Sequence, residues 1–169
     1  MAESPERPAE QPTPERLTHV RADGAVHMVD VSAKQATARR AVASGAVVTR
    51  PDVVELIRAG ELAKGEVLGV ARVAGILAAK RTPELVPLCH PLPLTGIEVE
   101  LTAEGDRVEI RAIVTTVGVT GVEMEALTAV SVAALTVYDM IKGVDRAAVI
   151  AELRVLEKDG GASGRWRAV

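Results

Sequence analysis

Four charged residues flank a thirteen-residue stretch of the sequence without a charge. Glu123 and Glu125 precede this stretch, and Asp139 and Lys142 follow it. Glu125 stands directly ahead of apolar residues, where a carboxylate is costly unless it is paired, so it is a candidate for ligand binding or proton transfer. Asp139 and Lys142 are three positions apart and would face the same side of a helix. In isolation they are an ordinary ion pair, worth about a few tenths of a kcal/mol.

Glu123 also has a structural interpretation. The segment from Thr120 to Glu123 has the spacing of a helix capping box. In such a box, the Thr120 hydroxyl and the Glu123 carboxylate would each bind a free backbone amide at the start of a helix. Sequence alone therefore favours a helix cap over a functional role for Glu123.

The turn around His90 offers a second kind of chemistry. Pro87 and Pro91 bracket this histidine, so the backbone is stiff and the direction of the imidazole is fixed. A fixed imidazole suits acid-base catalysis near neutral pH. The alternative is a structural histidine bonded to a backbone carbonyl. Neighbouring Cys89 would point elsewhere in an extended segment and is better interpreted as a small buried apolar residue.

Several basic residues stand near predicted loops and strands. Lys64, Lys158 and Arg39 would each be a solvated charge by default. A glycine-rich loop at 160–164 comes after Lys158 and could approach phosphates or form a mobile lid. It matches neither the Walker nor the Rossmann fingerprint.

Hydrophobic periodicity predicts an α+β domain. We expect strands over 25–32, 46–49 and 150–156, and a hairpin over 97–110 that turns at 104–106. Helices are predicted over 51–59, 66–81 and 122–142. Separate hairpins and helices favour an antiparallel sheet with helices on one face. Because the middle of the third helix is apolar on all sides, we expect part of it to meet another subunit.

Composition sets the broad class of the protein. Residues 1–16 are rich in proline and charge, which predicts a disordered tail, and 17–169 suffice for a single domain. The uncharged run 126–138 is shorter than the roughly 20 residues of a membrane span. With no export signal at the N-terminus, we expect a cytoplasmic protein. One Trp, one Tyr, no Phe and a net charge of -3 argue against nucleic-acid binding.

Five fragments share their order and spacing with a known family. They resemble the MoaC family, and the resemblance runs from about Leu17 to the C-terminus. The fragments are HMVDVS at 27–32, ARVAGI at 71–76, PLCHPL at 87–92, TGVEMEALTA at 120–129 and YDM at 138–140.

The resemblance implies a ferredoxin-like subunit that pairs into dimers and assembles into hexamers, with active sites at subunit interfaces. The implied reaction is that of a lyase in molybdenum cofactor biosynthesis. It converts 3',8-cyclo-7,8-dihydroguanosine 5'-triphosphate into cyclic pyranopterin monophosphate and pyrophosphate. The family's catalytic residues fall on Asp139, Lys142 and Lys64. Its substrate-binding residues fall on Leu88, Cys89, His90, Glu123, Met124, Glu125, Lys158 and Arg39.

These residue types suit that reaction. Rebuilding a guanine ring needs several proton transfers, which positioned acids and bases accelerate by about 10²–10⁴-fold each. Closing a cyclic phosphate with loss of pyrophosphate needs cations around the triphosphate. One departure is Val119, where some family members carry a lysine.

Two other classes remain open. One is a non-catalytic ferredoxin-like module that binds a small molecule. The other is a zinc-dependent pterin-forming hydrolase. Zinc is disfavoured because the chain has one cysteine and only three histidines, which lack the close spacing of metal ligands: His19, His27 and His90. The sequence calls for no cofactor and leaves open whether Mg²⁺ accompanies the triphosphate.

Overall fold

The computed structural model describes residues 24–161 and 164–168. The predicted tail at 1–16, His19, and Ala162 and Ser163 of the predicted loop lie outside the described residues. The described chain forms a five-stranded antiparallel sheet in the order β2-β3-β1-β4-β5. Its elements are β1 (Thr37–Val48), α1 (Pro51–Ala59), α2 (Val67–Lys80), α3 (Thr82–Leu85), β2 (Leu94–Glu104), β3 (Arg107–Gly118), α4 (Glu123–Ile141), β4 (Val149–Asp159) and β5 (Trp166–Arg167).

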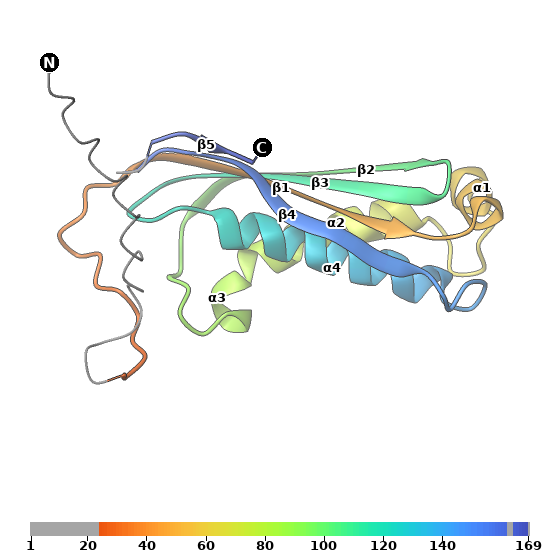
Figure 1. Cartoon of the computed structure of the whole chain (residues 1–169), viewed down its shortest axis with the longest axis horizontal. Coiled ribbons are helices and arrows are strands. Elements are labelled where there is room, and N and C mark those ends of the chain that lie inside the picture. The colour runs from red at the N-terminus through yellow and green to blue at the C-terminus, as the bar shows by residue number, and fades with distance from the viewer. Residues whose placement is uncertain (1–23, 162–163, 169) are drawn as a thin grey trace, which may run out of the picture.

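The connections confirm the predicted ferredoxin-like α+β fold. One unit runs from β1 through α1 and α2 to β2, and a second runs from β3 through α4 to β4. The first strands of the two units, β1 and β3, are neighbours at the centre of the sheet. Figure 1 shows α2 and α4 side by side beneath one face of this sheet. The two long helices, α2 and α4, therefore form a single layer on one side of the sheet.

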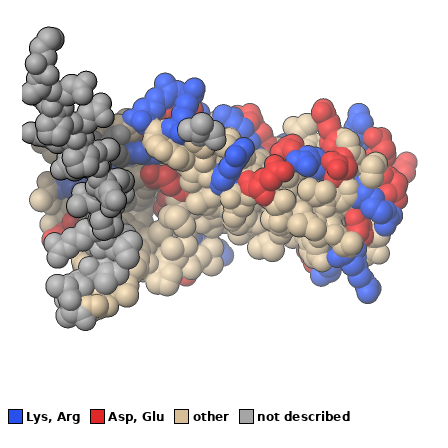
Figure 2. All heavy atoms as spheres, viewed as in Figure 1, with Lys and Arg blue, Asp and Glu red and all other residues tan. Residues whose placement is uncertain are grey.

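The sheet has one apolar and one charged face. On β3, Val108, Ile110, Ala112 and Val114 are buried in the core against the helices. The residues between them point to the opposite face of the sheet, away from the helices. On that face Arg111 forms an ion pair with Glu100 of β2 at 3.1 Å. Figure 2 shows the charged atoms gathered along the sheet side and mainly uncharged atoms over the helices.

Close packing brings α4 onto the centre of the sheet. At Gly45 of β1, an added Cβ would lie 2.8 Å from Cγ1 of Val130 in α4. Only a residue without a side chain permits this approach, because real Cβ contacts are longer. By length and composition alone α4 could cross a membrane, but 56% of its apolar window is buried inside the protein, as in a core helix.

Two predicted strands need correction. Over 25–32 only Val26 forms an isolated bridge, although His27, Val29 and Val31 are half-buried and the residues between them are exposed. The alternation therefore reflects packing of an extended segment and not pairing in the sheet. The strand predicted at 46–49 begins much earlier, at Thr37. Alanine, arginine, serine and glycine in its first part have weak β propensity, and its central position in the sheet overrides that preference.

Candidate functional site

Three predicted catalytic residues meet at the C-terminal end of α4. Asp139 lies in its last turn, Lys142 comes directly after the helix, and Lys64 lies in the loop between α1 and α2. The Nζ atom of Lys64 donates to Oδ2 of Asp139 at 2.7 Å and to the Asp139 carbonyl oxygen at 2.7 Å. The Nζ atom of Lys142 lies 2.7 Å from the other carboxylate oxygen, Oδ1. Each oxygen of one carboxylate thus holds a different lysine.

The two lysines set the charge state of this cluster. Hydrogen bonds from Lys142 and Lys64 lower the pKa of Asp139 to about 2. The same carboxylate raises the pKa of Lys142 above its usual value. At neutral pH the cluster is therefore one carboxylate between two ammonium groups. Proton transfer by these residues would require a ligand that draws the lysines away from Asp139.

A cavity of about 410 Å³ adjoins this cluster. Both lysines line it, so a ligand in this space would lie beside their side chains. The lining also contains groups that the sequence did not single out. Its lining residues are Lys64, Tyr138, Lys142, Gly143 and Arg146.

A second cavity, of about 380 Å³, lies at the other end of α4. Six of the predicted binding residues line it together, although two separate segments of the chain supply them: Leu88, Cys89, His90, Glu123, Met124 and Glu125. The remaining lining residues are Val29, Val31, Lys34, Leu92, Thr120 and Gly121. Sequence reasoning missed Lys34, and nothing in its neighbours distinguishes it from a solvated lysine.

His90 is bonded to a backbone carbonyl, as the structural interpretation of its sequence context expected. Its Nε2 atom lies 2.8 Å from the carbonyl oxygen of Val29. Because a carbonyl only accepts, Nε2 carries the proton and donates it. Neutral His90 therefore keeps its lone pair on Nδ1. The residue is anchored to a backbone carbonyl and also lines the cavity.

Glu125 is the most deeply buried carboxylate of this cavity, with 3% of its surface exposed. Burial, with the charge of nearby Glu123 in addition, raises its pKa. Burial likewise raises the pKa of Cys89, and Glu125 adds to that shift. Cys89 therefore remains a thiol at neutral pH and is a poor nucleophile. Glu125 can hold or release a proton nearer neutrality than an ordinary glutamate can.

The predicted capping box is wrong. Helix α4 begins at Glu123 with Val122 as its N-cap, and no side chain caps it. The Glu123 carboxylate folds back over Gly121, where an added Cβ would collide with it. The helix starts later than the motif requires, so Glu123 is the first helical residue and not the third. Its carboxylate is thus placed on the cavity wall.

Arg39 positions the approach to this cavity and does not line it. Its Nε and Nη2 atoms donate to the carbonyl oxygens of Gly118 and Val119, at 3.2 and 3.3 Å. It thereby holds the segment that leads to Thr120. Lys158 pairs with Ala41 in the sheet and so lies on the same face as Arg39, two residues earlier on β1. Lys158 also lies outside the described lining of the cavity.

The glycines after β4 have a structural explanation. Gly160 and Gly161 have φ angles of 94° and 76°, which side chains disfavour. An added Cβ would collide with the carbonyl of Ala38 at the first position and with the Arg39 guanidinium at the second. This part of the loop therefore wraps Arg39 closely.

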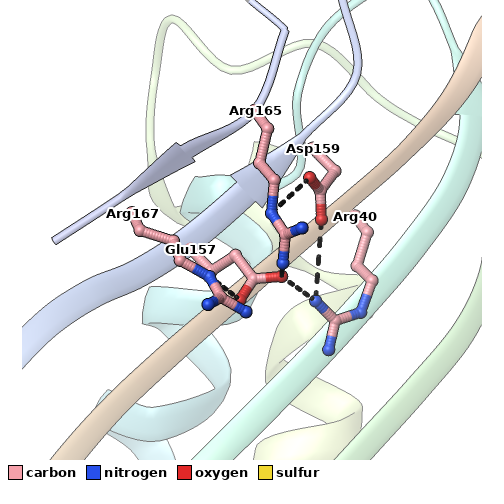
Figure 3. A network of polar contacts seen from close by, with 5 residues as sticks. All are labelled: Arg40, Glu157, Asp159, Arg165 and Arg167. Atoms are coloured by element: carbon pink, nitrogen blue, oxygen red, sulfur yellow. Dashed lines mark hydrogen bonds and ion pairs between the residues drawn. The ribbon is translucent and has the colours of Figure 1, made fainter.

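A charged clasp on the opposite face of the sheet holds the C-terminal strand. We define the clasp as Arg40, Glu157, Asp159, Arg165 and Arg167, which Figure 3 shows converging from β1, β4 and the β5 segment. Glu157 is its centre, with Arg40 Nη1 at 2.8 Å and Arg167 Nε at 2.9 Å. The clasp fastens the short strand β5 to β4.

The two cavities cannot serve one small ligand within one chain. Glu125 and Asp139 lie on the uninterrupted helix α4, fourteen positions apart, which is about 21 Å along the axis at 1.5 Å per residue. A metal centre does not join them: within 24–161 and 164–168, no group of three or more His, Cys, Asp and Glu side chains could hold a metal ion.

The fold and these two sites define a class of protein. A ferredoxin-like subunit with a carboxylate-lined cavity and a separate lysine-rich cavity is suited to a small ligand that carries both hydrogen-bond donors and negative charge. The chain belongs to the MoaC family, whose model matches residues 28–161.

Three curated relatives share one name, cyclic pyranopterin monophosphate synthase. The relative from Corynebacterium efficiens is 64% identical over 150 residues, which cover 89% of this chain and 97% of the relative. That from Streptomyces avermitilis is 59% identical over 155 residues, covering 92% and 91%. That from Thermomicrobium roseum is 61% identical over 153 residues, covering 89% and 92%.

Proposed function

We propose that this chain is a cyclic pyranopterin monophosphate synthase, a cytoplasmic lyase that releases pyrophosphate from a cyclised guanosine triphosphate. One observation carries the proposal. Eight of the eleven residues that the family resemblance marks as functional, which are scattered in sequence, line two cavities at the ends of α4, and a ninth, Asp139, pairs with the two lysines of one cavity. The names of the relatives support the same activity.

The cavity around Glu125 would bind the ring system of the substrate. Guanine and its pterin products present N–H donors along one edge, and the carboxylates of Glu123 and Glu125 are acceptors on the cavity wall. Because the pKa of Glu125 is raised, this residue can also return a proton to a ring nitrogen. The anchored His90 offers a second proton acceptor through Nδ1.

The opposite end of α4, where Lys142 and Lys64 line a cavity and pair with Asp139, would supply these three catalytic groups. In the free protein the lysines are held by Asp139. A triphosphate would attract both ammonium groups, which would weaken their bonds to the carboxylate and raise its pKa toward the usual range. Substrate binding would thus prepare Asp139 to accept a proton.

A two-fold dimer would bring the two cavities together. The outer surface of the helix layer is apolar: Val70, Val73 and Leu77 of α2 are about half exposed, and Leu135 of α4 is 56% exposed. On α4, Leu127 and Leu135 flank the smaller Ser131 by about one turn each. Two antiparallel copies that cross at Ser131 would bring the acidic end of one helix beside the basic end of the other.

This crossing matches the expected shared site. Glu125 is six positions before Ser131, and Asp139 is eight positions after it. Glu125 and Asp139 of the partner subunit would therefore differ by only about 3 Å along the axis. We propose that three such dimers form a hexamer, in keeping with the family resemblance.

Incubation with 3',8-cyclo-7,8-dihydroguanosine 5'-triphosphate tests the function directly. We expect release of pyrophosphate and appearance of pterin fluorescence, measured once in EDTA and once with Mg²⁺. Asp139→Asn should be inactive, whereas Arg111→Gln, on the charged face of the sheet, should be fully active. Binding without turnover would favour the non-catalytic module. Stoichiometric zinc that is lost together with activity would favour the zinc hydrolase.

A further inference from the structure

Arg146 is the third cation of the cavity beside Asp139. Lys64, Lys142 and Arg146 all line this space. Asp139 pairs with both lysines, one on each carboxylate oxygen. Within the described part of the chain, no carboxylate forms an ion pair with the Arg146 guanidinium. Three cations around one carboxylate leave an excess of positive charge that suits a polyanionic ligand.

The backbone of Arg146 is held in place from both sides. The preceding residue, Asp145, is buried and accepts hydrogen bonds from Thr49 Oγ1 at 2.7 Å and from the Ala147 amide at 2.9 Å. The carbonyl of Arg146 accepts a hydrogen bond from the Tyr138 hydroxyl at 3.2 Å. A loop fixed in this way holds the backbone of Arg146 in place, which lowers the backbone part of the entropic cost of binding.

A simpler role for Arg146 would be to offset the negative end of the α4 dipole. That role is already filled at the helix end. Lys142 is the C-cap residue, and the carbonyl of Ile141 accepts bonds from the amides of Val144 and Asp145. Arg146 comes after these residues and lines the cavity, so a ligand accounts for its position better than the dipole does.

We propose that Arg146, with Lys64 and Lys142, forms the subsite for the pyrophosphate leaving group. This inference rests on the proposed function. An arginine presents a planar fork that binds two phosphate oxygens at once, whereas lysine is a point charge. Lys64 and Lys142 must give up their bonds to Asp139 before they can bind the substrate. Arg146 forms no such ion pair in the described part of the chain, so its guanidinium can bind phosphate without breaking one.

The step that this subsite would serve is an internal phosphoryl transfer. A hydroxyl oxygen of the substrate forms a new bond to the α-phosphorus, and its proton leaves to a base, for which Asp139 is our candidate. The bond from the α-phosphorus to the oxygen bridging to the β-phosphate breaks. Its electron pair remains on that oxygen, as the developing charge of pyrophosphate. Arg146 would stabilise that charge.

Calorimetric titration with inorganic pyrophosphate tests the subsite without any turnover. Wild type, Arg146→Gln, Arg146→Lys and the distant control Arg111→Gln are compared, in EDTA and with Mg²⁺, after thermal unfolding has shown that each is folded. Loss of a charged hydrogen-bonding group should weaken binding by about 10- to 100-fold in Arg146→Gln. Arg146→Lys should fall between that variant and wild type, and Arg111→Gln should equal wild type.

Two results would overturn the inference: wild type that does not bind pyrophosphate, or Arg146→Gln that binds it as tightly as wild type does. Failure of the proposed function is a separate result, namely wild type that binds pyrophosphate but does not convert the cyclised nucleotide. In that case a weakened Arg146→Gln still supports a pyrophosphate subsite.

Discussion

Gly75 of α2 lies against the backbone carbonyl of Ala129 in α4, so closely that an added Cβ would be 2.9 Å from that oxygen. The contact sets how closely the two long helices approach. A methyl group at Gly75 must push them apart, so Gly75→Ala should lower the free energy of unfolding by about 1–3 kcal/mol. Gly143→Ala is the matched control because open space surrounds its Cβ position. Equal urea midpoints for the two variants would contradict this packing.

Glu125 should make stability fall as pH rises. Its pKa is raised in the folded protein, so its contribution is complete below the unfolded value of about 4.3 and is lost as pH rises through the folded value. The Glu125→Gln variant lacks this titrating group. The free energy of unfolding of the variant, relative to that of wild type, should therefore be greater at pH 8 than at pH 4. Urea unfolding at both values measures the difference. Exposed Glu55→Gln, on α1, should show no such pattern.

Lys64 and Lys158 should support activity and not folding. Lys64→Gln removes one of the hydrogen bonds that lower the pKa of Asp139, so a carboxyl NMR titration should show that pKa rising from about 2. Each Lys→Gln variant should raise KM or lower kcat, because the family resemblance counts both lysines among the residues that act on or bind the substrate. Melting temperatures should change little, because Lys64 is exposed and Lys158 is only half-buried, so neither side chain belongs to the core. Unchanged kinetics in either variant would remove that lysine from the site.

Inactive variants at the two ends of α4 should restore each other. Glu125→Ala and Asp139→Ala, unfolded and refolded together, would form mixed dimers in which one shared site carries both substitutions and the other neither. Turnover should then exceed that of either variant at equal total protein. Mass spectrometry confirms that subunits have mixed. Mixed oligomers without activity would rule out the shared site.

Glu157 should hold β5 to the sheet. Its side chain is only 15% exposed and contacts Arg40, Arg165 and Arg167. Glu157→Gln should loosen β5 without unfolding the domain, since the other clasp carboxylate, Asp159, remains. The chain has one tryptophan, Trp166, so increased acrylamide quenching of its fluorescence reports the loosening. Glu109→Gln, which weakens a different surface pair of Arg107, should leave the quenching unchanged.

Local signals in the sequence were sufficient for much of the fold. Pro51 and Gly60 bound α1 where predicted, because proline fits the first turn and Gly60 adopts a left-handed φ of 70°. The hairpin turn at Gly105 also has a positive φ, 60°. The start of β1 was missed, since its residues carry no strand pattern of their own and are placed by β3 and β4.

The candidate site residues also differ in how far the sequence could predict them. Spacing alone predicted that Cys89 and His90 point in different directions, and only the family resemblance grouped them in one binding segment. The bond between Lys64 and Asp139 joins residues seventy-five positions apart, which no local spacing can indicate. Lys34 and Arg146 were missed for the same reason, because a lysine or arginine in a polar loop gains meaning only from the cavity that it lines.

The unbroken helix between Glu125 and Asp139 has an evolutionary consequence. Each residue added to a helix turns the remainder of that helix by about 100° and advances it by about 1.5 Å. A single insertion or deletion inside α4 would therefore rotate Asp139 away from Lys64 and also spoil the symmetry about Ser131. We expect natural variants of this protein to keep the length of α4 fixed while they accept insertions in surface turns such as that at Gly105. Sequence drift in α4 is then confined to substitution.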